Sequence, residues 1–172
     1  MNNTLIYRNF ESADKEKVLK IYNFHIINGL ANFEENPIDF NEFEIIYNKI
    51  LSLRLPFIVC EKNKNIIGFA YLNTFRNKSG YRFSFENTIY IDEKHTGLGI
   101  GSELLKRLIF NASEKDHIKT IVAVIGGNNP EPSIKIHKKN GFSMIGTLKK
   151  IGFKKNTWLD VIYMQKVLNE KN

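Results

Sequence analysis

The sequence contains few of the residues that build cross-linked or metal-bound domains. Its single cysteine, Cys60, cannot form a disulfide within the chain or supply a cysteine-based metal site. His25, His95 and His117 show no spacing typical of metal ligands, so we expect no metal and assign them to structural or surface positions. Such sparing use of cysteine is typical of a reducing compartment, and we expect a cytoplasmic protein.

Long hydrophobic runs are also missing. No stretch approaches the ~18 uninterrupted apolar residues of a membrane helix, so we expect no membrane insertion. Residues 1–10 are polar and mixed, without a basic head or an apolar run, and we expect no secretory signal. Repeats, low-complexity segments and Pro/Gly/Ser-rich linkers are absent as well. The 172 residues, 42% hydrophobic and 25% charged, indicate a single globular domain over residues 1–172.

Net positive charge is confined to the end of the chain. Residues 1–134 carry equal numbers of basic and acidic side chains, whereas residues 135–172 hold nine lysines against Asp160 and Glu170. The whole net charge of +7 therefore lies in the last 38 residues. A basic surface favours an anionic partner, such as nucleic acid, a membrane surface or a phosphorylated small molecule. A solvated face without a partner is the alternative, and charge alone leaves both open.

Hydrophobic periodicity and turn residues predict seven strands and four helices. The predicted strands span residues 5–8, 57–60, 66–73, 83–91, 120–125, 142–150 and 158–166. The predicted helices span residues 13–25, 39–53, 101–111 and 133–140, with Ser12 and Asp39 as N-caps of the first two. This order indicates an α/β fold of the mixed α+β kind, with helices on both faces of a mixed sheet.

The most informative segment is the turn Thr96-Gly97-Leu98-Gly99-Ile100-Gly101, between a predicted strand and a predicted helix. Alternating glycines let the backbone approach a ligand closely, and the first N–H groups of the helix are free to bind phosphate oxygens. The turn is not a P-loop, because no Gly-Lys-Ser/Thr follows it. A Rossmann fingerprint would follow the first strand of a βαβ repeat, and here several strands precede it.

The element order and this turn resemble the GNAT N-acetyltransferase superfamily, whose pyrophosphate loop reads Arg/Gln-x-x-Gly-x-Gly/Ala. Aligning Gly99 and Gly101 with the two glycines puts Thr96 where Arg or Gln is usual. Aligning Gly97 and Gly99 instead puts Lys94 there, and we favour the first register. The departure at Thr96 puts a side-chain contact with the cofactor in doubt but leaves the backbone N–H contacts possible.

Further segments are similar to the phosphinothricin acetyltransferase subfamily, over about residues 6–166. They are Ala31–Glu35, Val122–Gly126, Ile136–Phe142, Gly152–Lys154 and Trp158–Asp160. The subfamily acetylates the α-amino group of amino acids and analogues, including phosphinothricin, methionine sulfone and methionine sulfoximine. It uses acetyl-CoA and usually forms dimers. The resemblance implies the GNAT fold with a mostly antiparallel sheet, acetyl-CoA as co-substrate, a small-molecule amine substrate and a homodimer.

Two residues are candidates for acid–base catalysis. An amino acid's amine is largely protonated at pH 7, so acetylation needs a base. Glu86 lies on the strand before the glycine turn, among aromatic residues that could raise its pKa, and it matches the subfamily's catalytic glutamate. A solvent-facing strand residue is the alternative. His137 stands four residues before the helix-ending glycine, where many GNAT enzymes have a tyrosine that protonates the leaving thiolate. Packing against CoA or hydrogen bonding to it is the alternative.

The resemblance also implies binding residues for the cofactor. The expected contacts come from the strand end, the glycine turn and the start of the following helix: Ile89, Tyr90, Ile91, Leu98, Gly99, Ile100, Gly101, Ser102, Asn129, Ser133 and His137. The choice between Asn128 and Asn129 is open, because this loop is one residue longer than in some relatives. Lys135, Lys138 or Lys139 could reach the 3′-phosphate of CoA.

For the substrate carboxylate we expect Arg76, ten residues before Glu86, since a guanidinium can hold a carboxylate with two parallel hydrogen bonds. Arg82 is the alternative, and Tyr81 and Phe33 are candidate pocket walls. Glu34 lies where phosphinothricin-active relatives can have a basic residue, so the natural substrate is left open.

Three other functions remain to be weighed. Acetylation of a protein or peptide N-terminus is disfavoured by Arg76, because a peptide has no carboxylate beside its amine. Nucleic-acid binding is disfavoured because the C-terminal lysines are not interleaved with a recognised motif, so we expect no nucleic-acid partner. The presence of Glu86 argues against a CoA-binding module without catalysis. The lysines in the last predicted strands, Lys149, Lys150, Lys154 and Lys155, have no assigned role.

Overall fold

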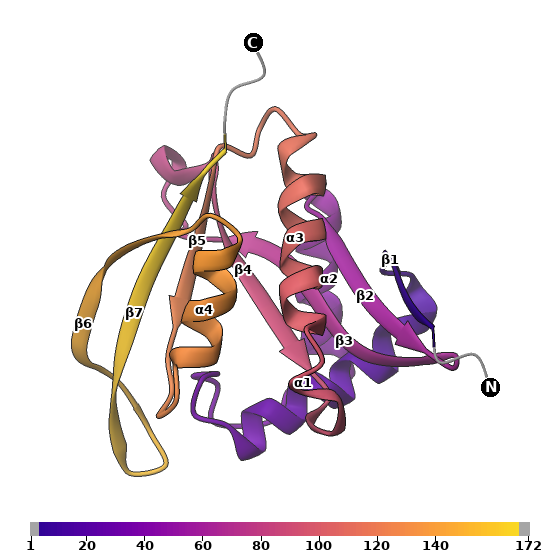
Figure 1. Cartoon of the computed structure of the whole chain (residues 1–172), viewed down its shortest axis with the longest axis horizontal. Helices are drawn as coiled ribbons and strands as arrows, with labels where there is room; N and C mark the ends of the chain where they lie inside the picture. The colour runs from indigo at the N-terminus through magenta and orange to yellow at the C-terminus, as the bar shows by residue number, and fades with distance from the viewer. Residues whose placement is uncertain (1–3, 169–172) are drawn as a thin grey trace.

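The computed structural model describes residues 4–168, whose seven strands form one sheet in the order β1-β2-β3-β4-β5-β7-β6 (Figure 1). The strands are β1 Leu5–Asn9, β2 Phe57–Lys62, β3 Asn65–Thr74, β4 Ser84–Ile91, β5 Thr120–Ile125, β6 Ser143–Lys154 and β7 Thr157–Val167. Only β4 and β5 run parallel, and every other neighbouring pair is antiparallel. The mixed, mostly antiparallel sheet confirms the fold predicted from the sequence.

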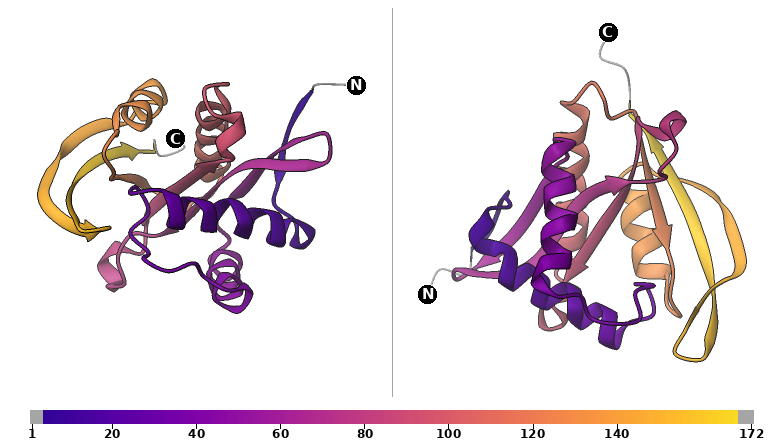
Figure 2. Two further views of the ribbon diagram at one scale, coloured as in Figure 1. Left: turned by 90° about the horizontal axis from the view of Figure 1, so that it is seen from below. Right: turned by 180° about the vertical axis from the view of Figure 1, so that it is seen from behind.

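Four α-helices cover the sheet, two on each face (Figure 2). They are α1 Lys15–Asn28, α2 Phe40–Ser52, α3 Ile100–Ser113 and α4 Glu131–Lys139. The first pair packs on one face and the second pair on the other. Short 3₁₀ helices at Ser12–Asp14, Ser79–Tyr81 and Glu93–His95 complete the regular structure. None of the helices in this described part of the chain is both long and apolar enough to cross a membrane.

Local signals explain where the helices begin. The Asp39 carboxylate accepts a hydrogen bond from the Glu42 N–H at 2.8 Å, and the Glu42 carboxylate accepts one from the Asp39 N–H at 2.8 Å. This capping box starts α2, with Asp39 as the N-cap predicted from the sequence. The predicted cap of α1 at Ser12 is wrong, because Ser12 lies in a 3₁₀ turn and α1 starts at Lys15. The Asp14 carboxylate accepts hydrogen bonds from the Arg8 guanidinium at 2.6 Å and from the Glu11 N–H at 2.9 Å, and these contacts stabilise the turn.

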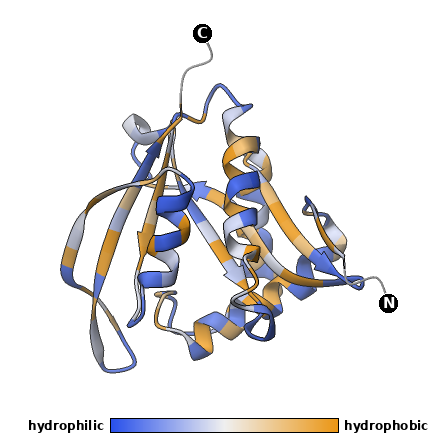
Figure 3. Cartoon of the chain, viewed as in Figure 1, coloured by the Kyte–Doolittle hydropathy of each residue, from blue (hydrophilic) through white to orange (hydrophobic). Residues whose placement is uncertain are grey.

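The core lies between the sheet and its helices, where buried apolar residues of strands and helices pack together. Figure 3 shows hydrophobic residues along both the strands and the helices. Leu104, Leu105 and Leu108 form the inward face of α3, and all three are fully buried. Val18 and Ile26 of α1 are equally buried on the opposite face. Each such side chain contributes about 1.5–3 kcal/mol relative to an exposed one, which fixes both helix layers to the sheet.

The last two strands are longer than predicted. They meet in a two-residue turn at Lys155 and Asn156, whose φ angles of +49° and +57° suit a tight hairpin. The turn was missed because lysine is not a typical residue for this conformation. β6 is the edge strand, and it carries register shifts after Met144 and Leu148, so it bows away from the sheet in Figure 1.

The pairing between β4 and β5 creates the opening that matters for function. It covers only three positions, from Ser84 with Thr120 to Glu86 with Val122. Beyond Glu86 the two strands part, as Figure 1 shows. Since both strands continue for several residues, their backbone N–H and C=O groups face a gap in the sheet.

Candidate active site

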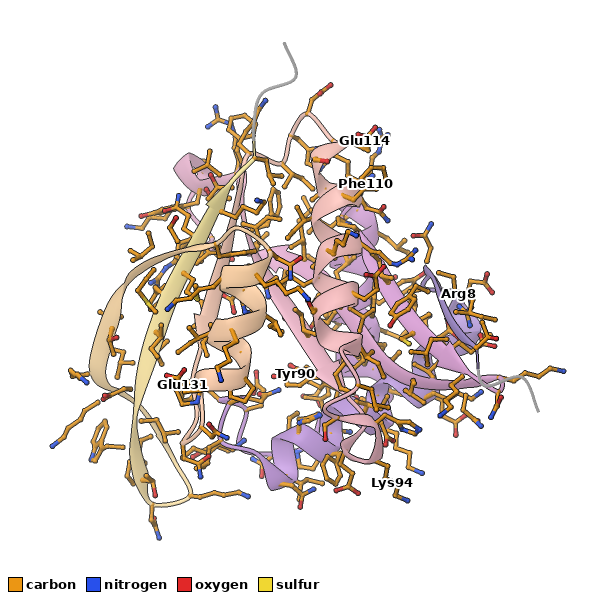
Figure 4. The ribbon with its side chains drawn as sticks, in the orientation of Figure 1. Arg8, Tyr90, Lys94, Phe110, Glu114 and Glu131 are labelled. Carbon is orange, nitrogen blue, oxygen red and sulfur yellow. The ribbon has the colours of Figure 1, made fainter. Side chains whose placement is uncertain are left out.

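A cleft of about 760 Å³ occupies the space where β4 and β5 part. Its walls come from both strands, the glycine turn with the start of α3, the face of α4, and the segment that follows α1. Tyr90 at the end of β4 and Glu131 at the start of α4 are labelled on either side of this region in Figure 4. The cleft therefore joins elements that are far apart in the sequence.

Glu86 lies in the cleft at the last paired position of β4, opposite Asn73 on β3 and Val122 on β5. Burial raises the pKa of its carboxyl from 4.5 to about 7, against a smaller lowering by the positive charge of Arg76. A carboxylate with a pKa near 7 can accept a proton at neutral pH, as a general base must. The structure thus places the predicted base in the cleft, where its surroundings raise the pKa of the carboxyl.

His137 is 3% exposed and lies on the α4 side of the cleft. Its Nδ1 is 2.7 Å from the Ser133 carbonyl oxygen, and its Nε2 is 3.0 Å from the side-chain nitrogen of Asn87. A carbonyl only accepts and an amide nitrogen only donates, so Nδ1 carries the proton and Nε2 accepts. Burial also lowers the pKa of the ring, which favours this neutral form. Both ring nitrogens are thus engaged by the protein itself.

Asn87 follows Glu86 on β4 and lines the same cleft. Its amide nitrogen is directed toward His137, while its Oδ1 is buried and has no hydrogen-bond partner among the described residues. A buried acceptor without a donor costs about 1–3 kcal/mol, so a partner from a bound ligand would relieve a real penalty. The sequence analysis did not identify Asn87 as a site residue. The available signal was its position directly after Glu86, since adjacent residues of a strand point to opposite faces of the sheet.

The glycine turn has the geometry of an anion site. Gly97 and Gly99 both have a φ of +78°, in the left-handed region that glycine adopts without strain. The first backbone bond of α3 runs from the Glu103 N–H to the Gly99 carbonyl, so the N–H groups of Ile100, Gly101 and Ser102 precede the helical ladder. Free N–H groups at the positive end of a helix bind phosphate oxygens.

Most of the predicted binding residues meet in this cleft, and four do not line it. Those that line it are Phe33, Glu86, Ile89, Tyr90, Ile91, Gly99, Ile100, Gly101, Ser102, Ser133 and His137. Leu98 is 59% exposed on the outside of the turn, and Asn129 is exposed on the loop before α4. Arg76 and Tyr81 lie outside as well, both against Phe75.

Several cleft residues were not predicted as site residues. Tyr22 from α1 and Asn32 from the following loop line one wall, and His95, which was assigned a structural or surface position, lines the cleft beside the glycine turn. Nothing local in the sequence marks Tyr22, because only the packing of α1 on β4 brings it here. Asn32 lies in the segment Ala31–Glu35 that carries the family resemblance, but it was not singled out there. Among residues 4–168, no three His, Cys, Asp or Glu side chains gather as metal ligands would.

Comparison with known proteins agrees with this architecture. Residues 8–163 match the family model of the acetyltransferase (GNAT) domain, and the chain belongs to that family. It is a GNAT N-acetyltransferase of the phosphinothricin acetyltransferase-like kind, which confirms the resemblance seen in the sequence.

Individual relatives share most of the chain. It is 35% identical to a phosphinothricin N-acetyltransferase of Alcaligenes faecalis over 91% of this chain and 79% of that protein. It is 30% identical to an L-methionine sulfoximine/L-methionine sulfone acetyltransferase of Salmonella typhimurium, over 93% and 92%. The crystal structure of a phosphinothricin acetyltransferase from Sinorhizobium meliloti in complex with AcCoA matches with a TM-score of 0.91 and 34% identity, over 98% and 91% of the two chains.

Proposed function

We propose that the protein transfers the acetyl group of acetyl-CoA to the α-amino group of a small amino acid or analogue, of the phosphinothricin, methionine sulfone or methionine sulfoximine type. The observation that carries the proposal is Glu86, a buried carboxyl with a pKa of about 7 at the point where the sheet opens. Relatives named as acetyltransferases of such compounds are 30–35% identical to this chain over about nine tenths of its length.

Glu86 is the general base of the proposed reaction. It takes one proton from the substrate ammonium, directly or through a water, and the neutral amine then attacks the thioester carbonyl. The new C–N bond replaces the C–S bond, and the nitrogen releases its second proton as the amide forms. The sulfur leaves as a thiolate that takes up one proton to give the free thiol of CoA. A carboxyl with an ordinary pKa would be a poorer base toward an amine, so the raised pKa of Glu86 serves this step.

Acetyl-CoA supplies the activated acetyl group, and the residues of the cleft fit the groups it would bring. The free N–H groups of Ile100, Gly101 and Ser102 suit its pyrophosphate. The partnerless Asn87 Oδ1 suits an amide N–H of the pantetheine arm. Lys135 on α4 also lines the cleft and is the best placed of the candidate lysines for a phosphate.

Of the two roles left open for His137, the geometry supports the binding role. A ring that already donates from Nδ1 and accepts at Nε2 has no free proton for the thiolate. His137 instead directs the Asn87 amide so that its oxygen faces the cofactor. The thiolate would then take its proton from water.

The substrate carboxylate is assigned to Arg76. Its guanidinium is exposed, stacks on Phe75 at 5.2 Å and is close enough to Glu86 to lower the pKa of that carboxyl. Arg82 is less suitable, because it donates to the Ser79 carbonyl and stacks on Phe83. Phe33 would line the amine pocket from the other side.

We also propose a homodimer formed through β6 and β7. The hairpin exposes large apolar side chains on the edge strand β6 and on its neighbour β7: Ile145 60%, Leu148 45%, Ile151 57%, Phe153 48% and Trp158 60% exposed. Exposed apolar patches of this kind favour association. Sedimentation should show a dimer that Ile151→Asp dissociates; a wild-type monomer would refute this arrangement.

The test of the function is a thiol-release assay with acetyl-CoA over a panel of amino acids, methionine sulfone, methionine sulfoximine, phosphinothricin and a short peptide. We expect turnover with at least one free amino acid and none with the peptide. We propose that the reaction takes place in the cytoplasm. Glu86→Gln should bind acetyl-CoA normally, and its kcat should fall about 10²- to 10⁴-fold. Full activity of that variant, or turnover of the peptide alone, would overturn the proposal.

A further inference from the structure

Lys154, the last residue of β6, is a lysine in the interior of the protein. It is 2% exposed and is among the largest fully buried side chains. Lysine is almost never buried to this degree unless its charge is compensated, since removing an ammonium from water is costly. No carboxylate within residues 4–168 pairs with Lys154 in the ion pairs of this structure. Its neighbour Lys155 is exposed, so the two adjacent lysines have different roles.

Two backbone carbonyls take the place of a carboxylate. The Lys154 ammonium donates to the Ile26 oxygen and to the Asn32 oxygen, each at 2.7 Å. Ile26 lies in the last turn of α1, whose carbonyls have no helical partner and form the negative end of the helix. Lys154 thereby closes the end of α1 and ties the segment after it to the β6–β7 hairpin.

That segment, Ala31–Glu34, forms one wall of the cleft. The Phe33 ring of this segment packs against the backbone of two glycines. A Cβ atom placed on Gly152 would be 2.1 Å from the ring, and one placed on Gly126 would be 2.8 Å from it. Both glycines are needed because any side chain there would displace Phe33. The wall is therefore held from two sides, by the hairpin and by the end of β5.

Asn32 connects the wall to the aromatic residues beside Glu86. It is 7% exposed, and its Oδ1 accepts from the Glu34 N–H at 2.9 Å. Its side chain lies close enough to the hydroxyls of Tyr22 and Tyr90 to lower the pKa of each, against a larger rise caused by burial. The wall held by Lys154 is thus part of the polar surface that an amine substrate would meet.

We propose that Lys154 is a positioning residue for the amine substrate, which acts by fixing Asn32 and Phe33 in the wall of the cleft. It does not line the cleft itself, so its effect passes through the two carbonyls it binds. The proposal rests on the proposed function in one respect, that the wall faces the amine. The residues proposed to hold the cofactor come from other elements, α3, β4 and α4.

Steady-state kinetics of Lys154→Met tests the proposal, because methionine keeps an apolar stem of similar length and removes the ammonium. We expect kcat/KM for the amine to fall about tenfold or more, since two buried carbonyls lose a charged donor. The KM for acetyl-CoA should change less than twofold. Lys154→Arg should recover part of the loss, and Lys155→Met is the matched control with wild-type kinetics. Equal losses for both substrates, or unchanged amine kinetics, would refute a positioning role.

A second variant moves the same wall without touching Lys154. Gly152→Ala adds a methyl group against Phe33, whereas Gly146→Ala on the same strand has no atom within 4 Å. The first should raise the KM for the amine and the second should not. This pair decides the question if Lys154→Met does not fold, and wild-type kinetics in Gly152→Ala would count against the proposal.

Hydrogen exchange separates this inference from the proposed function. Backbone amides of residues 31–34 should exchange faster in Lys154→Met than in wild type, and at the wild-type rate in Lys155→Met, whatever the substrate. If wild type acetylates no amine of the panel, the proposed function fails while this measurement still applies. Unchanged exchange in Lys154→Met would show that the lysine does not hold the wall.

Discussion

The raised pKa of Glu86 makes this carboxyl a source of instability in the folded protein, and this gives a prediction with a definite sign. In the unfolded chain the carboxyl ionises near 4.5, and in the folded protein near 7. Between these values the folded state binds more protons than the unfolded state, so stability falls as the pH rises from about 4.5 to about 7. The penalty is complete above the folded pKa and absent below the unfolded one.

Glu86→Gln removes the ionisation and keeps the shape of the side chain. The difference between 4.5 and about 7 corresponds to about 3 kcal/mol, an upper figure because solvent screens a carboxylate that is only partly buried. At pH 8 we therefore expect the variant to be more stable than wild type by about 1–3 kcal/mol, or several degrees in Tm. At pH 4 the two proteins should unfold at the same temperature.

Differential scanning calorimetry of both proteins from pH 4 to pH 8 measures this difference directly. The comparison at pH 4 is the internal control, since Glu86 is protonated there in both states and resembles glutamine. The pH dependence of activity is the second test of the raised pKa. In wild type, kcat/KM for the amine should rise with pH through about 7. A variant that is less stable than wild type at pH 8, or a stability difference that does not depend on pH, would refute the assignment of a desolvated carboxyl.

Other substitutions address the remaining groups of the site. His137→Phe should weaken acetyl-CoA binding in calorimetry about tenfold by releasing Asn87, while kcat at saturation changes less; a lost kcat with normal binding would restore the acid role. Arg76→Gln should raise the KM for the amino acid about 10–100-fold, whereas Arg82→Gln should not, and the reverse order would exchange their roles. Gly99→Ala should cost about 1–2 kcal/mol of stability and weaken cofactor binding, because its φ is +78°; unchanged unfolding and binding would contradict the need for glycine.

Much of the fold follows from local patterns in the sequence. Hydrophobic periodicity located α3 and β5, and Asp39 marked the start of α2. The glycine turn was also recognised, since alternating glycines before a helix restrict what the backbone can do. These features depend on residues within one or two turns of each other, which is why the sequence alone reveals them.

Tertiary structure decided how the site works. The sequence singled out Glu86 as the base, but its pKa of about 7 depends on burial by segments far away in the chain. The same is true of His137, whose partner Asn87 is 50 residues distant, and of Lys154, whose carbonyl partners lie 122 and 128 residues away. From the sequence alone, a lysine in a strand is predicted to be exposed to solvent. Its burial could not be predicted, because burial depends on how distant segments pack around it. The sequence determined which groups the chain possesses, and the parting of β4 and β5 decided which of them meet.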